Sequence, residues 1–409
     1  MTACSCDYDR LMPFNTALEK LLESASVVSG TEELALDQAV GRVLAADVCS
    51  AISVPPADNS AMDGYAVNTT SLPESLLIPI SQRIAAGEQG QSLEPGTAAR
   101  IFTGSEIPPG ADAVIMQEQC RRVGDDIQLL IHPEEGDHIR PAGQDIQPGN
   151  CVVAQGTVLD GRHLGVIASV GVPKVNVFRR IKVAVLTTGD ELVLPGQPCG
   201  PGKIFNSNYF TLQGLLEPMG VDVVFPGIIQ DDPDATRNAL KDAAEHADLV
   251  ISSGGVSVGE EDHVKAAVES LGELMLWRLA IKPGKPLAYG RVGDTPFIGL
   301  PGNPGAVLVT FLMLARPYIR TMQGCGEVLP KRFSVKSGYE RKKVVAREEF
   351  LRASLSVDNG ELSAAPAHSQ SSGVLSSSVM ADGLLVIPSE QAVAKGDQLE
   401  FIPFKGLLA

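Results

Sequence analysis

The sequence predicts a multidomain protein that combines an α/β domain with β-rich domains. With 409 residues, the chain exceeds the size that one hydrophobic core usually supports, so several domains are expected. Strand-like and helix-like patterns alternate from Lys182 onward, which is typical of a parallel sheet covered by helices on both faces. Short apolar runs without helical spacing come before and after this region and predict strands.

The start of the chain shows helical spacing in two places. Apolar residues recur at intervals of three and four, which predicts two amphipathic helices. The first contains Ala17, Leu18, Leu21 and Leu22, and the second contains Leu36, Ala39, Val40, Val43 and Leu44. After these two segments, helical spacing is next seen near His163–Val170.

Two other regions are strand-rich. Between residues 51 and 145, short apolar runs are separated by turn residues such as Pro-Gly, which predicts a β-rich domain. These runs are Leu77–Ile80, Ala113–Met116 and Ile127–Ile131. Beyond Pro330 the runs are Val344–Phe350, Leu362–Ala364, Leu384–Ile387 and Leu399–Ile402. A small all-β domain is therefore expected at the C-terminal end.

The α/β region contains the clearest local signals. Val183–Leu186 is a buried-strand run, and a helical pattern containing Leu212 and Leu216 ends at Gly220. Strand Val221–Phe225 precedes Asp231-Asp232-Pro233, which predicts an N-cap and the first turn of a helix over 235–247. Strand Leu249–Ile251 follows directly. These elements give the alternation on which the fold class rests.

Composition excludes several functional classes. The formal charge of −16 and a pI near 4.9 argue against a nucleic-acid surface or an anionic membrane surface. The N-terminal residues contain no secretory signal, and the longest apolar stretch, Ala306–Ala315, is too short to span a bilayer. The seven cysteines are scattered, which fits a reducing compartment. We therefore expect a soluble, cytoplasmic protein.

Three segments follow expected strands of the parallel sheet, where ligands of such folds bind. They are Thr187–Glu191, the Gly-rich segment Ser252–Gly259, and Pro301-Gly302-Asn303-Pro304 before a helix. Gly-rich turns that lead into helices let several backbone N–H groups converge on phosphate oxygens. A single such turn is as often structural, and the three together favour a binding site.

Charged side chains cluster beside these segments. Arg278, Lys282 and Lys285 place three cations within eight positions of an acidic protein, and Pro283 and Pro286 stiffen the segment. A fixed positive patch of this kind suits an oxyanion. Acids occur at Asp63, Asp145, Glu118, Asp231 and Asp262. Each acid taken singly is more often a cap or a surface group than a ligand.

Taken in order, these motifs resemble the MoeA family, the molybdopterin molybdenumtransferases or molybdenum insertases, which are related to the E domain of gephyrin. The resemblance rests on Asp58–Ala66, Thr187–Leu192, Ser252–Gly259, Lys282–Pro286 and Pro301–Pro304. The chain departs from the family pattern at Ala57, Arg278 and Gly305. The molybdopterin adenylyltransferases share the Gly-Gly and Pro-Gly-Asn-Pro elements, so Asp58–Tyr65 and Lys282–Pro286 distinguish the insertion enzymes.

The resemblance implies a bent, elongated homodimer. Residues 1–50 would pair with 146–178 as a linking domain, and 51–145 would form the β-rich domain. Residues 179–328 would form an α/β domain of the molybdopterin-binding type, and 329–409 a C-terminal β-barrel. The implied enzyme inserts molybdate into adenylylated molybdopterin and releases AMP and molybdenum cofactor. Because every reactant is anionic, Mg²⁺ is the expected cofactor.

The same resemblance assigns roles to residues of a site in a cleft. Because the acids come from separate domains, the site can be shared across the dimer. The expected catalytic residues are Asp63, Asp145, Asp231, Asp262, Lys282 and Arg278. The expected substrate-binding residues are Thr103, Glu118, Gly254, Gly255, Ser257, Lys285, Pro301, Asn303 and Pro304. The expected metal ligands are Asp63, Glu191, Asp231 and Asp262.

Two other functional classes stay open at this point. A non-catalytic pterin-binding scaffold or carrier would bind the same ligand without releasing AMP. A nucleotide-dependent phosphotransferase is disfavoured because the chain has no Gly-x-x-x-x-Gly-Lys-Ser/Thr loop. The chain carries one copy of the Gly-Gly and Pro-Gly-Asn-Pro pair, so we expect a separate molybdopterin adenylyltransferase to supply the substrate.

Overall fold

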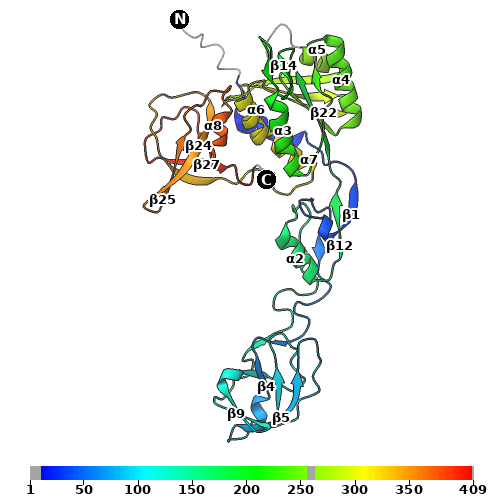
Figure 1. Cartoon of the computed structure of the whole chain (residues 1–409), viewed down its shortest axis with the longest axis vertical. Coiled ribbons are helices and arrows are strands. Elements are labelled where there is room, and N and C mark those ends of the chain that lie inside the picture. The colour runs from blue at the N-terminus through cyan, green and yellow to red at the C-terminus, as the bar shows by residue number, and fades with distance from the viewer. Residues whose placement is uncertain (1–10, 256–262, 408–409) are drawn as a thin grey trace.

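The computed structural model describes residues 11–255 and 263–407 of the chain. It is elongated, with an α/β domain and a β-barrel side by side at one end and a separate β-rich domain at the other (Figure 1). A small linking domain that contains α2, β1 and β12 lies between the two ends (Figure 1). Among the described residues, no helix is long and apolar enough to cross a membrane.

The α/β domain is built on a mixed seven-stranded sheet. Its strand order is β16-β13-β18-β22-β21-β19, and β17 pairs with β13. Strands β16, β13, β18 and β22 run parallel, whereas β21 pairs antiparallel with β22 and β19 pairs antiparallel with β21. The strands are β13 Lys182–Thr188, β16 Asp222–Val224, β17 Ile228–Ile229, β18 Leu249–Ser253, β19 Gly272–Arg278, β21 Pro286–Val292 and β22 Thr295–Leu300.

Helices cover both faces of this sheet. Along β13, Val183 and Val185 pack into one core with α3 and α7, whereas Ala184 and Leu186 pack into the other with α4 and α5. The helices are α3 Ser207–Leu216, α4 Pro233–His246, α5 His263–Leu271, α6 Pro304–Thr310 and α7 Arg316–Met322, with a π-helical turn, Phe311–Ala315, between α6 and α7. A separate short parallel pair, β14 Leu192–Val193 and β15 Ile204–Phe205, follows β13 in the chain.

The predicted helix boundaries of this domain are confirmed. The Asp232 carboxylate accepts a hydrogen bond from the Ala235 backbone N–H at 2.7 Å and caps α4. Gly220, with a φ of 74°, ends the short helical turn Glu217–Met219 in the left-handed conformation that glycine tolerates best.

The prediction of two N-terminal helices is half wrong. Helix α1, Phe14–Glu23, is present, but it packs into the α/β core, where Phe14 stacks edge-on against Phe350 at 5.2 Å. The second predicted helix, over residues 36–44, is instead a single 3₁₀ turn, Leu36–Gln38, followed by an irregular segment, and it comes directly after strand β1, Thr31–Ala35. Its helical spacing arises because residues of an irregular segment, Leu44 and Ala39, enter one core together.

The linking domain is therefore joined by strands rather than by helices. Strand β1 pairs antiparallel with β12, Lys174–Phe178, and β2, Val48–Cys49, pairs antiparallel with β11, Cys151–Val153. Helix α2, Gly161–Ser169, confirms the predicted helical segment, and Asp160 caps it. The chain thus crosses this domain twice, once on the way to the distal β-rich domain and once on the way back.

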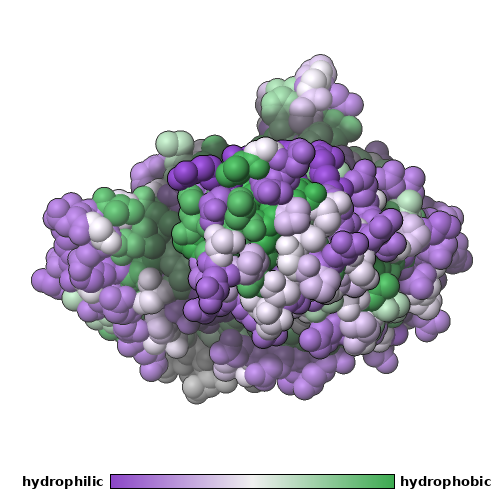
Figure 2. All heavy atoms as spheres, turned by 90° about the horizontal axis from the view of Figure 1, so that it is seen from below, coloured by the Kyte–Doolittle hydropathy of each residue, from purple (hydrophilic) through white to green (hydrophobic). Residues whose placement is uncertain are grey.

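The distal domain confirms the predicted strand-rich region. A six-stranded sheet runs in the order β7-β4-β6-β5-β9-β8. The strands are β4 Gly64–Val67, β5 Leu77–Ile84, β6 Ala98–Ile101, β7 Ala113–Met116, β8 Cys120–Val123 and β9 Asp126–Leu129, with a separate pair of β3 Asn59–Ser60 and β10 Ile139–Arg140. Leu77, Val123 and Leu130 are exposed on this domain, and apolar surface is visible among polar surface from the distal end (Figure 2).

The C-terminal region is a closed five-stranded barrel. Strands β24, β25, β23, β27 and β26 follow one another, and β24 also pairs with β26, which closes the ring. The strands are β23 Phe333–Ser337, β24 Glu348–Asp358, β25 Glu361–Pro366, β26 Gly383–Ile387 and β27 Gln398–Pro403, with the short helix α8, Ser376–Val379. Strand β20, Ile281–Lys282, leaves the α/β domain and pairs with β24, so Lys282 lies on the barrel.

Candidate functional site

The carboxyl ends of β13, β18 and β22 meet at one edge of the α/β sheet. Two asparagines from the start of α3 bind these ends together. The Asn206 side-chain amide donates to Thr187 Oγ1 at 2.8 Å. The Asn208 amide donates to Ser253 Oγ and to the Gly302 carbonyl oxygen, both at 2.8 Å. This network ties the start of α3 to all three strand ends, which lie at one edge of the sheet as expected for a parallel sheet.

The Gly-Gly turn after β18 requires both glycines. Gly254 and Gly255 have φ values of 96° and 66°, a region that other residues rarely adopt. A Cβ on Gly255 would also lie 2.4 Å from Val264 Cγ2 of α5. The Gly254 N–H donates to the Leu300 carbonyl oxygen at 3.2 Å, so the turn is held against β22 at the sheet edge. Ser257 and Asp262, which we expected in the site, lie outside the described residues.

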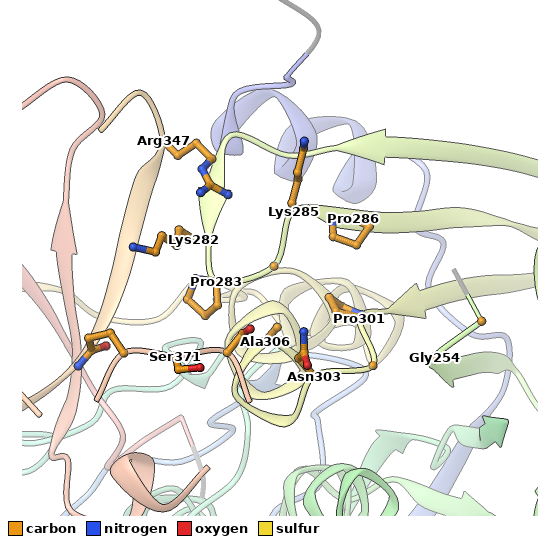
Figure 3. Close-up of a pocket in the computed structure, with 15 residues that line it drawn as sticks. Gly254, Lys282, Pro283, Lys285, Pro286, Pro301, Asn303, Ala306, Arg347 and Ser371 are labelled. Atoms are coloured by element: carbon orange, nitrogen blue, oxygen red, sulfur yellow. The ribbon is translucent and has the colours of Figure 1, made fainter. Parts of the chain in front are cut away.

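A cavity of about 640 Å³ opens between this sheet edge and the C-terminal barrel. Arg347 lies between Lys282 and Lys285 on one side of the cavity, and Asn303 and Ser371 lie on the opposite side (Figure 3). Three cationic side chains around one cavity, in a protein of net charge −16, make a local site for anions. The cavity also reaches Gly254, Gly255, Gly284, Pro301 and Gly302.

Lys282 joins the cavity to the barrel through an ion pair. Its Nζ donates to Glu349 Oε1 at 2.9 Å, and the second Glu349 oxygen pairs with Arg341. The Glu349 side chain is 1% exposed, whereas the Lys282 side chain is 44% exposed. Burial lowers the pKa of Lys282, and the positive charges of Arg347 and Arg341 lower it further. Lys282 is therefore anchored to the barrel at the edge of the cavity, and its side chain stays partly exposed.

The barrel also supplies one wall of the cavity, formed by Gln370, Ser371 and Ser372. The fully buried Arg352 holds this wall, because its guanidinium donates to the carbonyl oxygens of Ser369 and Ser371, each at 3.1 Å. The wall contacts the α/β domain where the Gly305 N–H donates to the Ser372 carbonyl oxygen at 2.8 Å.

Gly305 is therefore a requirement of this contact. A Cβ at this position would lie 2.4 Å from Arg352 Nη1 and 2.9 Å from the Ser372 carbonyl oxygen. The departure from the family pattern at Gly305 has a local structural explanation here.

A second cavity, of about 340 Å³, adjoins the first and shares Gly254, Gly302 and Asn303 with it. Glu191 lines it, and the neighbouring Asp190 exchanges backbone-to-carboxylate hydrogen bonds with Asp231 at 3.2 and 3.3 Å. Two of the predicted metal ligands thus lie around one turn. In the part of the chain that the structure describes, no group of three or more His, Cys, Asp or Glu side chains could hold a metal ion.

The distal domain carries a separate polar face. Asp63 Oδ1 accepts hydrogen bonds from the backbone N–H and the hydroxyl of Thr103, both at 2.8 Å, and these bonds with the nearby Arg100 lower the pKa of Asp63. Arg100 donates to Gln117 Oε1 at 2.7 Å, and Gln117 donates to Glu118 at 3.2 Å. Asp63, Thr103 and Glu118 are thus brought together, and we call this group the distal acidic face.

This group lies at the opposite end of the elongated molecule from the cationic cavity (Figure 1). Asp145 is in neither place. Its backbone N–H donates to the Val54 carbonyl oxygen at 3.0 Å in the neck, the paired segments 50–54 and 145–150 that join the distal and linking domains. Arg278 is exposed at the end of β19 and does not line the cavity.

Sequence reasoning missed several residues of the cavity. Arg347 takes the place that we expected Arg278 to fill, and Arg352 and the 370–372 wall had not been predicted. No local signal identified them, because they come from the barrel and are about 60 residues or more from Lys282 in the chain. Several charges fall close together in Arg341–Arg347, but this spacing does not indicate a contact with Lys282.

Comparisons with known proteins agree over the whole length. Family models match residues 12–171 as the MoeA N-terminal region (domains I and II), 184–321 as a probable molybdopterin binding domain, and 335–404 as the MoeA C-terminal region (domain IV). The molybdopterin molybdenumtransferase of Haemophilus influenzae is 39% identical over 97% of this chain and 100% of its own length. The enzyme of that name from Bacillus subtilis is 32% identical over 88% of this chain and 86% of its own length.

A solved structure agrees as well. The crystal structure of a molybdopterin biosynthesis MoeA protein from Pyrococcus horikoshii has a TM-score of 0.84 to this chain at 28% identity, covering 96% of this chain and 100% of that one. The arrangement of an α/β domain, β-rich domains and a terminal barrel is therefore shared with that protein.

Proposed function

The chain belongs to the MoeA family, and from this membership we propose that it inserts molybdenum into molybdopterin. It is then a transferase of molybdenum cofactor biosynthesis, as its relatives are named. The observation that carries this function is the cationic cavity beside the strand-end loops. Lys282, Lys285 and Arg347 there suit an oxyanion such as molybdate, while the adjoining Gly254 and Asn303 loops suit a phosphorylated ligand.

The substrate that we propose is adenylylated molybdopterin, with AMP and molybdenum cofactor as products. The adjacency of the two cavities supports this choice, because one ligand can place its phosphates beside the loops and its reacting end beside the cations. Arg347 and Lys282 would hold the molybdate oxygens and offset the charge repulsion between the two anions. Arg352 would keep the barrel wall closed over them.

Mg²⁺ is the proposed cofactor. Glu191 and Asp231 would hold it, since Mg²⁺ is commonly bound by one or two carboxylates together with substrate phosphates. The described residues fit this mode, because Glu191 lines the smaller cavity and Asp231 is bonded to the adjacent Asp190. When bound, the metal supplies charge neutralisation at the phosphoanhydride. The expected ligand Asp262 lies outside the described residues.

We propose a homodimer in which the distal acidic face of one chain meets the cationic cavity of the other. The support is the separation of the two predicted parts of the site at opposite ends of one elongated chain (Figure 1). Asp63, Thr103 and Glu118 would then act on the ligand held by the partner copy. The exposed apolar Met275 and Leu276 on the edge strand β19 offer surface for a contact between copies.

The remaining parts of the proposal concern the cellular setting. A cytoplasmic location fits the composition, and a separate molybdopterin adenylyltransferase would supply the substrate. Direct transfer between the two enzymes would protect the pterin dithiolene from oxidation. The single α/β domain with one Gly-Gly and Pro-Gly-Asn-Pro set supports this division of labour.

The test is an assay of the purified protein with adenylylated molybdopterin, molybdate and Mg²⁺. Release of AMP that depends on molybdate is the expected result, whereas ligand binding without AMP release would identify a scaffold. A parallel reaction contains molybdopterin, ATP and Mg²⁺. Pyrophosphate in that reaction would refute the need for a separate adenylyltransferase.

A further inference from the structure

Two cysteines face each other where the linking domain meets the neck of the distal domain. Cys49 of β2 and Cys151 of β11 are directly opposite in the antiparallel register. Both thiols are free and both residues are exposed. Neither residue belongs to the cavities or to the distal acidic face, so the proposed function does not account for this juxtaposition.

The geometry of this pair matches the requirements of a disulfide. Residues directly opposite in an antiparallel ladder have Cα atoms about 4.5 or 5.5 Å apart, and disulfides span Cα distances of about 4.4 to 6.8 Å. Opposite residues also project their side chains from the same face of the ladder. The side chains of Cys49 and Cys151 are accordingly neighbours on one face of the ladder.

The position of the pair gives the bond a structural consequence. Cys49 precedes the excursion of the chain into the distal domain, and Cys151 follows its return. Backbone hydrogen bonds continue the pairing into the neck, from Ser50 to Asn150 at 2.9 Å and from Val54 to Ile146 at 2.8 Å. A covalent bond at this point would close the loop that contains the whole distal domain.

We propose that Cys49 and Cys151 are a reversible thiol modification site, at which a small-molecule disulfide such as oxidised glutathione forms an intramolecular cross-link. One protein thiolate attacks the small disulfide, which gives a mixed disulfide and releases one glutathione thiolate. The second protein thiolate attacks the mixed disulfide and releases the other glutathione. The two protein thiols lose two electrons and two protons, and two reduced glutathione molecules gain them.

The local electrostatics set the pH dependence of this exchange. Partial desolvation by the surrounding groups raises the pKa of the exposed Cys151 thiol, and the neighbouring Asp47 and Cys49 raise it further. The thiolate is the attacking species, so cross-linking is slow near neutral pH and accelerates as pH rises. Once formed, the cross-link restricts the unfolded chain, so the oxidised distal domain should melt at a higher temperature than the reduced one.

The experiment treats the reduced full-length protein with oxidised glutathione, blocks free thiols, and digests it without reduction for mass spectrometry. The expected product is a peptide pair joined through Cys49 and Cys151 that dithiothreitol separates. Cys199→Ser, a substitution of another exposed cysteine, should leave this yield unchanged, and Cys49→Ser should abolish both the pair and the rise in melting temperature. Stable glutathione adducts on both Cys49 and Cys151 without the internal bond, or equal cross-linking through Cys199, would overturn the proposal.

Discussion

The cationic cavity and the distal acidic face differ in charge, in construction and in place. The cavity gathers Lys282, Lys285 and Arg347 from an α/β edge and a barrel, whereas the distal face gathers Asp63 and Glu118 on one small sheet. The first suits anions, and the second suits a cation or a proton. They lie at opposite ends of the elongated molecule, so the two sets do not meet within one copy (Figure 1). A reaction that needs both would require two copies.

The largest effect is expected from removing one charge at each end. Lys282→Ala and Asp63→Ala should each lower the rate of AMP release by about 100-fold to 1000-fold, because each removes a charged contact from the reacting groups. Steady-state assays with adenylylated molybdopterin check this, and circular dichroism checks folding. Lys336→Ala, which changes a lysine on the barrel away from the cavity, is the control. Full activity in both site variants would refute the assignment.

A second comparison tests Arg278, which the sequence predicted to be in the site, against Arg347, which lines the cavity. Arg347→Ala should weaken the use of molybdate by about tenfold or more, because it removes a charge from the cavity. Arg278→Ala should have a smaller effect, because Arg278 does not line the cavity. The measurement is the molybdate concentration at half-maximal rate for both variants. The reverse order of effects would place the oxyanion nearer to β19.

The contact between the barrel wall and the α/β domain can be loosened by one methyl group. Gly305→Ala should lower the free energy of unfolding by about 1–3 kcal/mol, because the new Cβ overlaps Arg352 and Ser372. The displaced wall should also raise the KM for molybdate. Thermal unfolding and kinetics measure both effects. Gly302→Ala is a matched control for stability, because its nearest heavy atom would be 3.7 Å away.

The smallest effect concerns pH. Because the pKa of Lys282 is lowered, its positive charge is fully present at low pH and is lost as pH rises through a value below that of an ordinary lysine. Molybdate affinity should therefore fall a few-fold between about pH 7 and about pH 9.5. Calorimetric titration measures it. Lys282→Arg, whose guanidinium stays protonated, should flatten this dependence, and an equally steep decline would exclude Lys282 as its source.

The sequence predicted the parts of the site that depend on local backbone signals. Gly254, Pro301 and Asn303 follow strands of a parallel sheet, so their meeting at one edge follows from the fold class. Lys282 and Lys285 stood out because a short proline-rich segment concentrated charge. The strands of the barrel and of the distal domain were visible as short apolar runs for the same local reason.

The errors and omissions lie where tertiary contacts decide. The spacing of Leu36, Ala39 and Leu44 looked helical, but it reflects shared burial in one core. The residues just before them pair with β12 as strand β1. Arg347 and Arg352 act through a barrel that folds against a distant loop, and no spacing in the sequence indicates that contact. The location of Asp63 far from Lys282 depends on the linking domain between them, and no local sequence pattern indicates that distance (Figure 1).

The most direct test of a site shared between two copies is a mixing experiment. The Lys282→Ala and Asp63→Ala proteins, each inactive alone, are mixed under conditions that allow subunits to exchange. If the two residues act across the dimer, half of the dimers are mixed and each has one intact site, so activity should recover to about a quarter of the wild-type value. If both residues act within one chain, every site stays defective and the mixture should remain as inactive as its components.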